Sequence, residues 1–184
     1  MSAEKNRIYS EILAIRCRRR DSGALEELIS LWEKRLFYYI RRLVDDEEDT
    51  WDILQETWLK VLRGIGGLRE PQSLPMWLYS IARNTAMSHL RGRYADKAAT
   101  DENGDPSDAD GDAEAFSFED AEQVHLGLSR LSLPHREVLT LHFLDDLSVE
   151  EIAELLEFSQ GTIKSRLHYA KLALRTVIEQ EESK

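Results

Sequence analysis

The chain has 184 residues, of which 42% are hydrophobic and 32% charged, and its net charge is −11. This length suits one ordinary domain or two small ones, with the composition of a soluble globular protein. No stretch approaches the roughly 18 apolar residues that a membrane span needs. The first residues are polar and show no secretory signal. The single cysteine, Cys17, excludes an intramolecular disulfide and a cysteine-rich zinc site. Taken with the lack of a long apolar stretch and of a secretory signal, this predicts a cytoplasmic protein without a metal site or membrane insertion.

The first half of the chain carries two helical stripes of apolar residues. The first stripe consists of Leu25, Leu28, Ile29, Trp32, Leu36, Phe37, Ile40 and Leu43, and the second of Leu54, Trp58, Val61 and Leu62. We expect the four tryptophans, Trp32, Trp51, Trp58 and Trp77, to lie mainly in the core. No segment shows the alternation of a strand, so the predicted fold class is all-α.

A glycine-rich break separates the second stripe from a third helix. Gly64, Gly66 and Gly67 end the preceding helix, and Pro71 delays the next one. Ser73 is a candidate N-cap for a helix over residues 74–93, whose first turn tolerates a proline.

The excess negative charge is concentrated in one segment. Residues 95–123 hold eleven acidic side chains and one basic side chain, whereas residues 1–94 hold 14 acidic and 16 basic ones. The segment is rich in Asp, Gly, Pro and Ser and lacks apolar periodicity before Phe116, so it buries too little apolar surface to offset the entropy of ordering. We predict a linker over residues 95–122 between two helical domains, residues 1–94 and 123–184.

Shorter helices follow the linker. Pro134 suits a first turn, and the stretch from Ser148 to Glu151 reads as a capping box. A tight turn over residues 157–159 then leads to a last helix with Ser159 as its N-cap. Its inner stripe consists of Ile163, Leu167, Ala170 and Leu174. A short capped helix, a tight turn and a longer helix together predict a helix-turn-helix.

The outer side of the last helix lacks carboxylates. Residues 159–175 contain four basic side chains and no acidic one, and small or polar residues such as Gly161, Ser165 and His168 lie opposite the apolar stripe. Phosphates repel carboxylates, and small side chains let a helix enter the major groove. This pattern favours duplex DNA binding over the alternative of a plain solvated helix.

Two further surfaces lie in the first domain. Residues 74–94 contain Arg83, Arg91 and Arg93 but no carboxylate, and aromatic residues lie among them. Aromatic rings beside cations suit unstacked bases, although a core aromatic stripe with a basic edge explains the pattern equally well. Residues 45–58 are acidic instead, and no accompanying nucleophile and base suggest catalysis. A solvated face or a surface for a basic partner protein is the better interpretation there.

Four stretches together resemble the extracytoplasmic-function group of bacterial RNA polymerase sigma factors. These stretches are DTWDILQETW at 49–58, WLYSIARN at 77–84, LSVEEIA at 147–153 and GTIKSRLH at 161–168. The similarity covers roughly residues 24–93 and 131–174. It implies two helical domains, sigma regions 2 and 4, and a role in transcription initiation without enzymatic activity, cofactor or small-molecule substrate.

The resemblance also implies site residues and partners. The expected partners are the beta-prime and beta subunits of core RNA polymerase, promoter DNA and an anti-sigma factor. Core binding falls to Asp49, Asp52, Gln55 and Glu56. Recognition and melting of the minus-ten element fall to Arg63, Arg69, Gln72, Trp77, Tyr79, Arg83, Asn84, Ser88, Arg91 and Arg93. Recognition of the minus-thirty-five element falls to Ser159, Gln160, Thr162, Lys164, Ser165, Arg166, His168, Tyr169 and Lys171.

Three residues depart from the usual pattern of the group. Trp51 stands where an acidic or polar residue is usual, Ser88 where an Asp is common, and Tyr169 where an Arg is common. We expect them to change details of core binding, of promoter melting and of the minus-thirty-five sequence that is recognised. The acidic linker is either a plain tether or a mimic of nucleic acid in a basic channel of the polymerase.

Two other functions remain as alternatives at this point. A helix-turn-helix regulator that does not bind core polymerase explains the second domain but not the WLYSIARN stretch. An anti-sigma or adaptor protein that mimics nucleic acid explains the acidic segment, and it would show no promoter preference. Binding to purified core polymerase separates the regulator from a sigma factor.

Overall fold

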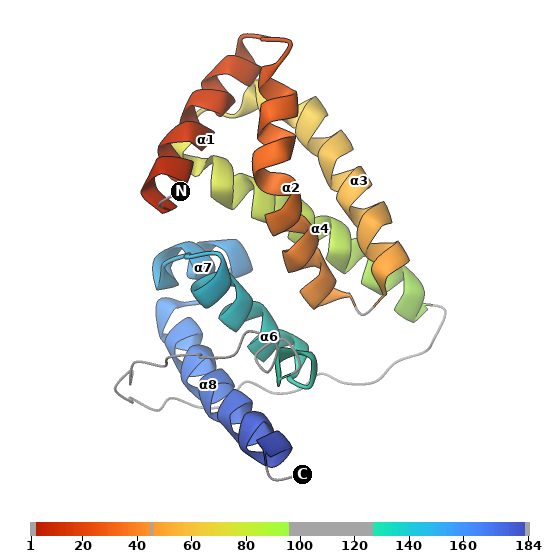
Figure 1. Cartoon of the computed structure of the whole chain (residues 1–184), viewed down its shortest axis with the longest axis vertical. Helices are drawn as coiled ribbons and strands as arrows, with labels where there is room; N and C mark the ends of the chain where they lie inside the picture. Colours follow the sequence, from red (N-terminus) through yellow and green to blue (C-terminus); the bar gives the residue numbers. More distant parts are fainter. Residues whose placement is uncertain (1–2, 45, 96–126, 183–184) are drawn as a thin grey trace. The chain divides into compact units, whose positions relative to one another are not determined.

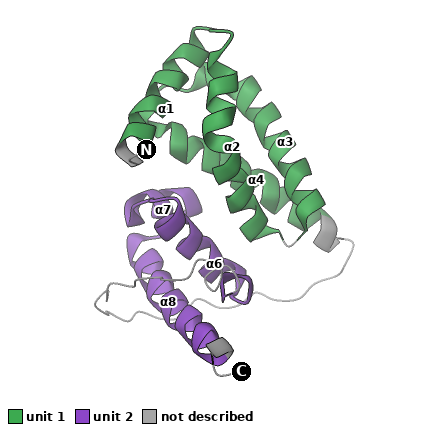
Figure 2. Ribbon diagram, viewed as in Figure 1, with its two compact units in different colours: residues 1–100 green, residues 101–184 purple. Residues whose placement is uncertain are grey.

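The computed structural model describes residues 3–44, 46–95 and 127–182. The chain divides into two compact units, residues 1–100 and 101–184 (Figure 2). Every secondary-structure element within the described ranges is helical, which confirms the predicted all-α class. The predicted linker, residues 95–122, lies outside the described residues except for its first residue.

Four helices build the first unit (Figure 1), and two short 3-10 turns lie between the last two. The elements are α1 (Ala3–Arg18), α2 (Ala24–Leu43), α3 (Glu47–Gly64), η1 (Ile65–Gly67), η2 (Pro71–Ser73) and α4 (Leu74–Ala95). Helices α2, α3 and α4 pack against one another, and α1 packs against α2, α4 and both 3-10 turns. The hydroxyl of Ser73 donates to the carbonyl of Glu70 and closes the turn before α4.

The core of this unit contains buried residues of both predicted apolar stripes and further residues outside them. The fully buried aliphatic side chains include Leu28, Leu36, Ile40, Leu54 and Val61 from the predicted stripes, together with Leu13, Ile53, Leu74 and Leu78. Each contributes about 1.5–3 kcal/mol relative to an exposed position. Threonines fill narrow places in the interior, because Thr50, Thr57 and Thr85 donate their hydroxyls to carbonyls four residues earlier, at 2.6–2.8 Å. A buried hydroxyl satisfied within its own helix lets neighbouring helices approach without loss of a hydrogen bond.

Two residues expected in the core lie on the surface. Trp51 is 44% exposed and Leu62 is 54% exposed, because both fall on the outer side of α3. The ring of Trp51 packs on Phe37 of α2, with ring centroids 4.4 Å apart. Trp32 is buried as expected, and its indole Nε1 donates to Ser10 of α1 at 3.0 Å.

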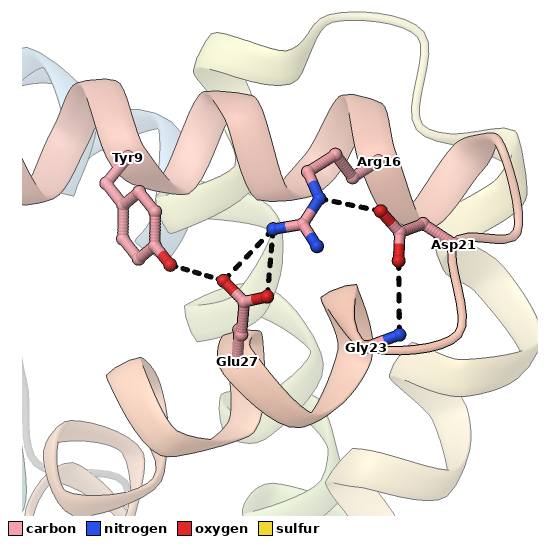
Figure 3. A network of polar contacts seen from close by, with 5 residues as sticks. All are labelled: Tyr9, Arg16, Asp21, Gly23 and Glu27. Atoms are coloured by element: carbon pink, nitrogen blue, oxygen red, sulfur yellow. Dashed lines mark hydrogen bonds and ion pairs between the residues drawn. The ribbon is translucent and has the colours of Figure 1, made fainter.

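A polar network joins α1 to the start of α2 (Figure 3). The Arg16 guanidinium donates to Asp21 at 2.8 Å and to both oxygens of Glu27 at 2.9 and 3.0 Å. The Tyr9 hydroxyl donates to Glu27, and the amide of Gly23 donates to Asp21 at 3.1 Å. The bond from Tyr9, followed by the bond from Arg16, lowers the pKa of Glu27, and the bond from Arg16 lowers the pKa of Asp21.

The second unit contains the predicted pair of helices and the helix before it (Figure 1). Its elements are α6 (Leu133–Leu139), a π-helical stretch η3 (Thr140–Leu144), α7 (Val149–Leu156) and α8 (Gln160–Glu182). Pro134 lies in the first turn of α6, as predicted. The capping box is confirmed: the amide of Glu151 donates to the Ser148 hydroxyl at 3.2 Å, and the amide of Ser148 donates to the Glu151 carboxylate at 2.9 Å.

Candidate functional site

Backbone hydrogen bonds fix the turn between α7 and α8. Glu157 ends α7 in the left-handed conformation, with φ 61°. The amide of Phe158 donates to the carbonyl of Ala153 at 3.0 Å, and the amide of Glu157 donates to the carbonyl of Glu154 at 3.4 Å. This double closure is a Schellman motif. The amide of Thr162 donates to the Ser159 hydroxyl at 3.1 Å, which confirms Ser159 as the N-cap of α8.

Helix α8 buries the predicted stripe and presents the predicted DNA-binding residues on its other sides. The stripe Ile163, Leu167, Ala170 and Leu174 is at most 5% exposed. Ser159, Gln160 and Lys164 are exposed. The half-exposed residues are Thr162, Ser165, Arg166, His168, Tyr169 and Lys171. The structure therefore leaves all nine predicted residues accessible on one helix and its cap.

Aromatic rings hold two of the cations on α8. The guanidinium carbon of Arg166 lies 3.8 Å from the ring centroid of Phe158, and the ammonium of Lys171 lies 5.4 Å from that of Phe143. His135 of α6 faces the same region. Burial, followed by the charge of Arg166, lowers the pKa of His135.

The outer side of α4 carries much of the predicted minus-ten surface. Trp77, Asn84, Ser88 and Arg91 follow at spacings of seven, four and three, so they share one side of the helix. Asn84, Ser88 and Arg91 are exposed, and the Arg91 guanidinium donates to the Ser88 hydroxyl at 3.2 Å. Arg83 is half-exposed on the flank of this side.

The residues before α4 adjoin this side through a close contact at Gly64. A Cβ atom at Gly64 would lie only 2.9 Å from the ring of Trp77, so a side chain there would displace the indole. The end of α3 thus lies against the first turn of α4. The exposed side chains of Arg63, Arg69 and Gln72 come from this end of α3 and from the turns that follow.

Tyr79 does not belong to an accessible surface. It is 1% exposed, and its ring makes edge contacts with Trp32 at 5.8 Å and with Tyr39 at 5.2 Å between centroids. Tyr79 lies on the inner side of α4 with the buried residues Leu78, Ala82 and Ala86, so we assign Tyr79 to the core. The side chain of Arg93 lies outside the described residues.

The outer side of α3 is acidic and partly apolar. Asp52, Gln55 and Glu56 are exposed, whereas Asp49 is half-buried. Oδ1 of Asp49 lies 3.2 Å from Nε2 of His89 on α4. Lys60 pairs with Glu56 at 2.8 Å and donates to Thr85 of α4 at 3.0 Å.

Neither a metal site nor a membrane span is found in the part of the chain that the structure describes. Its His, Cys, Asp and Glu side chains form no group of three or more that could hold a metal ion. No helix among these residues has both the length and the apolar character to cross a bilayer.

Sequence comparisons match both units to one class of protein. The profile of Sigma-70 region 2 matches residues 28–95, and the profile of Sigma-70 region 4 matches residues 121–174. The chain is 32% identical over 175 residues to the RNA polymerase sigma-H factor of Pseudomonas aeruginosa, covering 88% of this chain and 90% of that protein. It is 33% identical over 150 residues to the ECF RNA polymerase sigma factor SigL of Mycobacterium tuberculosis, covering 79% and 83%.

Solved structures share the same fold. The chain is similar to CnrH, solved with the cytosolic domain of CnrY, with a TM-score of 0.67 and 19% identity over 94% of this chain and 98% of that one. It is also similar to the sigma factor RpoE of Bartonella quintana, solved with the anti-sigma factor NepR. Here the TM-score is 0.68 and the identity 24%, over 85% of this chain and 98% of that one.

The two helical units and these matches define an RNA polymerase sigma factor, which binds core polymerase and promoter DNA to start transcription. Within this class, the chain belongs to the extracytoplasmic-function group. The resemblance drawn from the four sequence stretches is thus confirmed, and the regulator without core binding is not favoured.

Three features near these surfaces were not predicted from the sequence. They are the network that joins α1 to α2, the tilted contact between the rings of Trp51 and Phe37, and the position of Arg166 over the ring of Phe158. Each joins residues from different elements, so no periodicity marks it. The nearest sequence signal is an aromatic residue at a position that the helical pattern places outside the core, as for Phe158 in the turn.

Proposed function

We propose that this sigma factor divides promoter recognition among three surfaces: the outer sides of α3, α4 and α8. The observation that carries the proposal is the opposite charge of α3 and α8. Residues 47–64 hold five carboxylates and two cations, whereas residues 159–175 hold four cations and no carboxylate. A carboxylate-rich side repels phosphates and suits a basic protein surface, and a carboxylate-free side suits DNA.

The α3 surface binds core polymerase in this proposal. Asp52, Gln55 and Glu56 face solvent and contact the clamp helices of beta-prime. Trp51 adds apolar area beside Asp52, and its contact with Phe37 holds the indole in place. Tryptophan is enriched at interface hot spots. Trp51 therefore supplies an apolar contact with the polymerase at a position where an acidic or polar residue is usual. Asp49 is half-buried beside His89 of α4 and contributes less to the interface.

The α4 surface opens the minus-ten element. Trp77, Asn84 and Arg91 share one side of a helix whose residues 74–92 include no carboxylate. A partly exposed indole beside cations and an amide suits stacking and hydrogen bonding to unpaired bases. The turns from Arg63 to Gln72, with Arg69, adjoin this side and contact the displaced strand.

The α8 surface reads the minus-thirty-five duplex. The Schellman turn and the Ser159 cap give α8 a fixed start, which a helix needs for entry into the major groove in one register. Lys164, Arg166 and Lys171 contact phosphates, and Gln160, Ser165 and His168 contact base edges. Tyr169 takes part through ring and hydroxyl, so its base preference differs from that of an arginine.

The division 1–94, 95–122 and 123–184 completes the proposal: two working domains joined by a tether. An anti-sigma factor is a further proposed partner, supported by the complexes in which similar folds were solved. We also propose that the protein acts in the cytoplasm and catalyses no reaction of its own.

Run-off transcription with purified core polymerase tests the proposal. We expect promoter-specific transcripts only when the full chain is added, and loss of transcripts when Asp52→Lys and Glu56→Lys are combined. Transcription that is indifferent to charge at all three surfaces would contradict the assignment of residues.

A further inference from the structure

The turn of the helix-turn-helix carries a large aromatic side chain that the core does not use. Phe158 is 40% exposed, although a phenylalanine gains most from burial. Its backbone follows the left-handed Glu157 and is held by the bond from its own amide to the carbonyl of Ala153, and the next residue, Ser159, caps α8. The ring therefore projects from a fixed point at the start of the DNA-binding helix.

The partner of this ring is a cation of the same surface. Arg166 follows Phe158 by eight residues, and its guanidinium carbon lies 3.8 Å from the ring centroid. That distance is well inside the roughly 6 Å within which a cation is attracted to a ring face. A guanidinium that stacks through its face keeps its N–H donors in its own plane, where a phosphate can accept them in a bidentate pair.

The surroundings of Arg166 favour the same arrangement. His135 lies near enough for the charge of Arg166 to act on it: burial, followed by this charge, lowers the pKa of His135. A lowered pKa disfavours the charged imidazole, which would repel the guanidinium over the ring. A long arginine side chain loses much rotamer freedom when it binds, and stacking removes part of that freedom beforehand.

We propose that Phe158 is a positioning residue that holds the Arg166 guanidinium for contact with a phosphate of duplex DNA. This inference rests on the proposed function of α8. In this inference the turn contributes to DNA affinity through the side chain of Phe158, in addition to the hydrogen bonds that fix the start of α8.

A double-mutant cycle on the full chain tests this role. The proteins are the wild type, Phe158→Leu, Arg166→Ala and the combination, and the readout is filter binding to a minus-thirty-five duplex at two salt concentrations. We expect Phe158→Leu to weaken binding about threefold to tenfold, since an exposed to partly desolvated cation–π contact has this strength. In the Arg166→Ala background the same change should have no further effect.

Two conservative variants separate stacking from bulk. Phe158→Tyr keeps the ring face and should keep wild-type affinity, whereas Arg166→Lys keeps the charge, loses the planar stack and should bind about as weakly as Phe158→Leu. Leu144→Ala is the matched control, because Leu144 has a similar exposed fraction of 41% in the same unit. It should leave affinity unchanged. If Phe158→Leu fails to fold, Arg166→Lys alone decides: full affinity overturns the proposal.

The outcomes distinguish this inference from the function it rests on. The positioning role is overturned if the losses of duplex affinity for Phe158→Leu and Arg166→Ala are additive. It is also overturned if Phe158→Tyr loses as much affinity as Phe158→Leu. If Lys164→Ala and Arg166→Ala both leave duplex affinity unchanged, the assignment of α8 to the duplex fails instead, and the positioning role fails with it.

Discussion

The outer sides of α3 and α8 are built alike and charged oppositely. Each belongs to a long amphipathic helix whose inner stripe is buried. Helix α3 contacts α4 through polar groups: the ammonium of Lys60 donates to Thr85, and Asp49 lies beside His89. Helix α8 is held at its start by local bonds, through Phe158 and Ser159. In the proposed function, helix packing supplies the frame, and the surface charge, which packing leaves free, selects the partner.

The largest expected effect is on core binding. Combining Asp52→Lys and Glu56→Lys should weaken affinity for core polymerase about 30-fold or more, because loss of an interface hot spot costs about 2 kcal/mol. Titration of labelled core measures the affinity. Glu150→Lys with Glu154→Lys is a matched control, since these exposed carboxylates have the same spacing on α7. Equal losses in both double variants would mean that net charge alone matters.

The next effect separates strand opening from recruitment. Combining Arg83→Ala with Asn84→Ala should lower the permanganate reactivity of unpaired thymines about tenfold. The reason is that a hydrogen bond to a charged group contributes about 1.5 kcal/mol, and the double variant loses such a contact with the opened strand. Recruitment to duplex promoter DNA should change little. Thermal unfolding shows whether the fold is intact, as Arg83 also takes part in contacts within the protein. A parallel loss of recruitment and opening would end the division between α4 and α8.

A smaller effect concerns the salt dependence of duplex binding. Lys164→Ala and Arg166→Ala should each lower the slope of log affinity against log salt by about 0.9, if each side chain contacts one phosphate. Filter binding between 50 and 200 mM salt resolves such a change. Asp52→Lys is the contrasting variant, because it lies on α3 and should leave this slope alone. Unchanged slopes would place the contacts on other cations of the second unit.

Local and non-local features differ in how well the sequence predicted them. The capping box at Ser148 and the N-cap at Ser159 were predicted correctly, because each involves residues three apart. The exposure of Trp51 and the burial of Tyr79 were not predicted, because each depends on which neighbour faces that side of the helix. Periodicity locates an apolar stripe, but its edges are decided by packing partners such as Phe37 and Trp32.

A modest gain in stability is expected at the turn before α8. Glu157 adopts φ 61°, a conformation in which a non-glycine residue destabilises the folded state by about 1–2 kcal/mol. Glycine removes this strain, but it also raises the entropy of the unfolded chain, which offsets part of the gain. Glu157→Gly should therefore stabilise the second unit by about 0.5–1 kcal/mol. All four tryptophans lie in the first unit. The midpoint of urea unfolding should therefore shift when it is monitored by circular dichroism, and it should stay the same when it is monitored by tryptophan fluorescence. A shift in both signals would show that the units unfold together.

The smallest effect is a pH dependence in the first unit. The pKa values of Asp21 and Glu27 are lowered in the folded chain, so their contribution is present above the ordinary carboxyl range and is lost as pH falls through the lowered values. The network is solvent-exposed and screened, which keeps the effect small. Arg16→Gln should flatten the fall in melting temperature between about pH 5 and pH 3, measured by tryptophan fluorescence. If the melting temperature of this variant depends on pH as that of the wild type does, the network makes no contribution to stability in acid.

The fastening of α1 has a consequence for synthesis on the ribosome. Helix α1 is synthesised before η1, η2 and α4, against which it packs, and the Arg18 guanidinium donates to the carbonyl of Arg69, 51 residues later, at 3.3 Å. Contacts of such sequence separation form late, because loop closure must come first. Helix α1 thus waits with part of its apolar side open until α4 has emerged, and a nascent chain stalled before that point offers a site for chaperones.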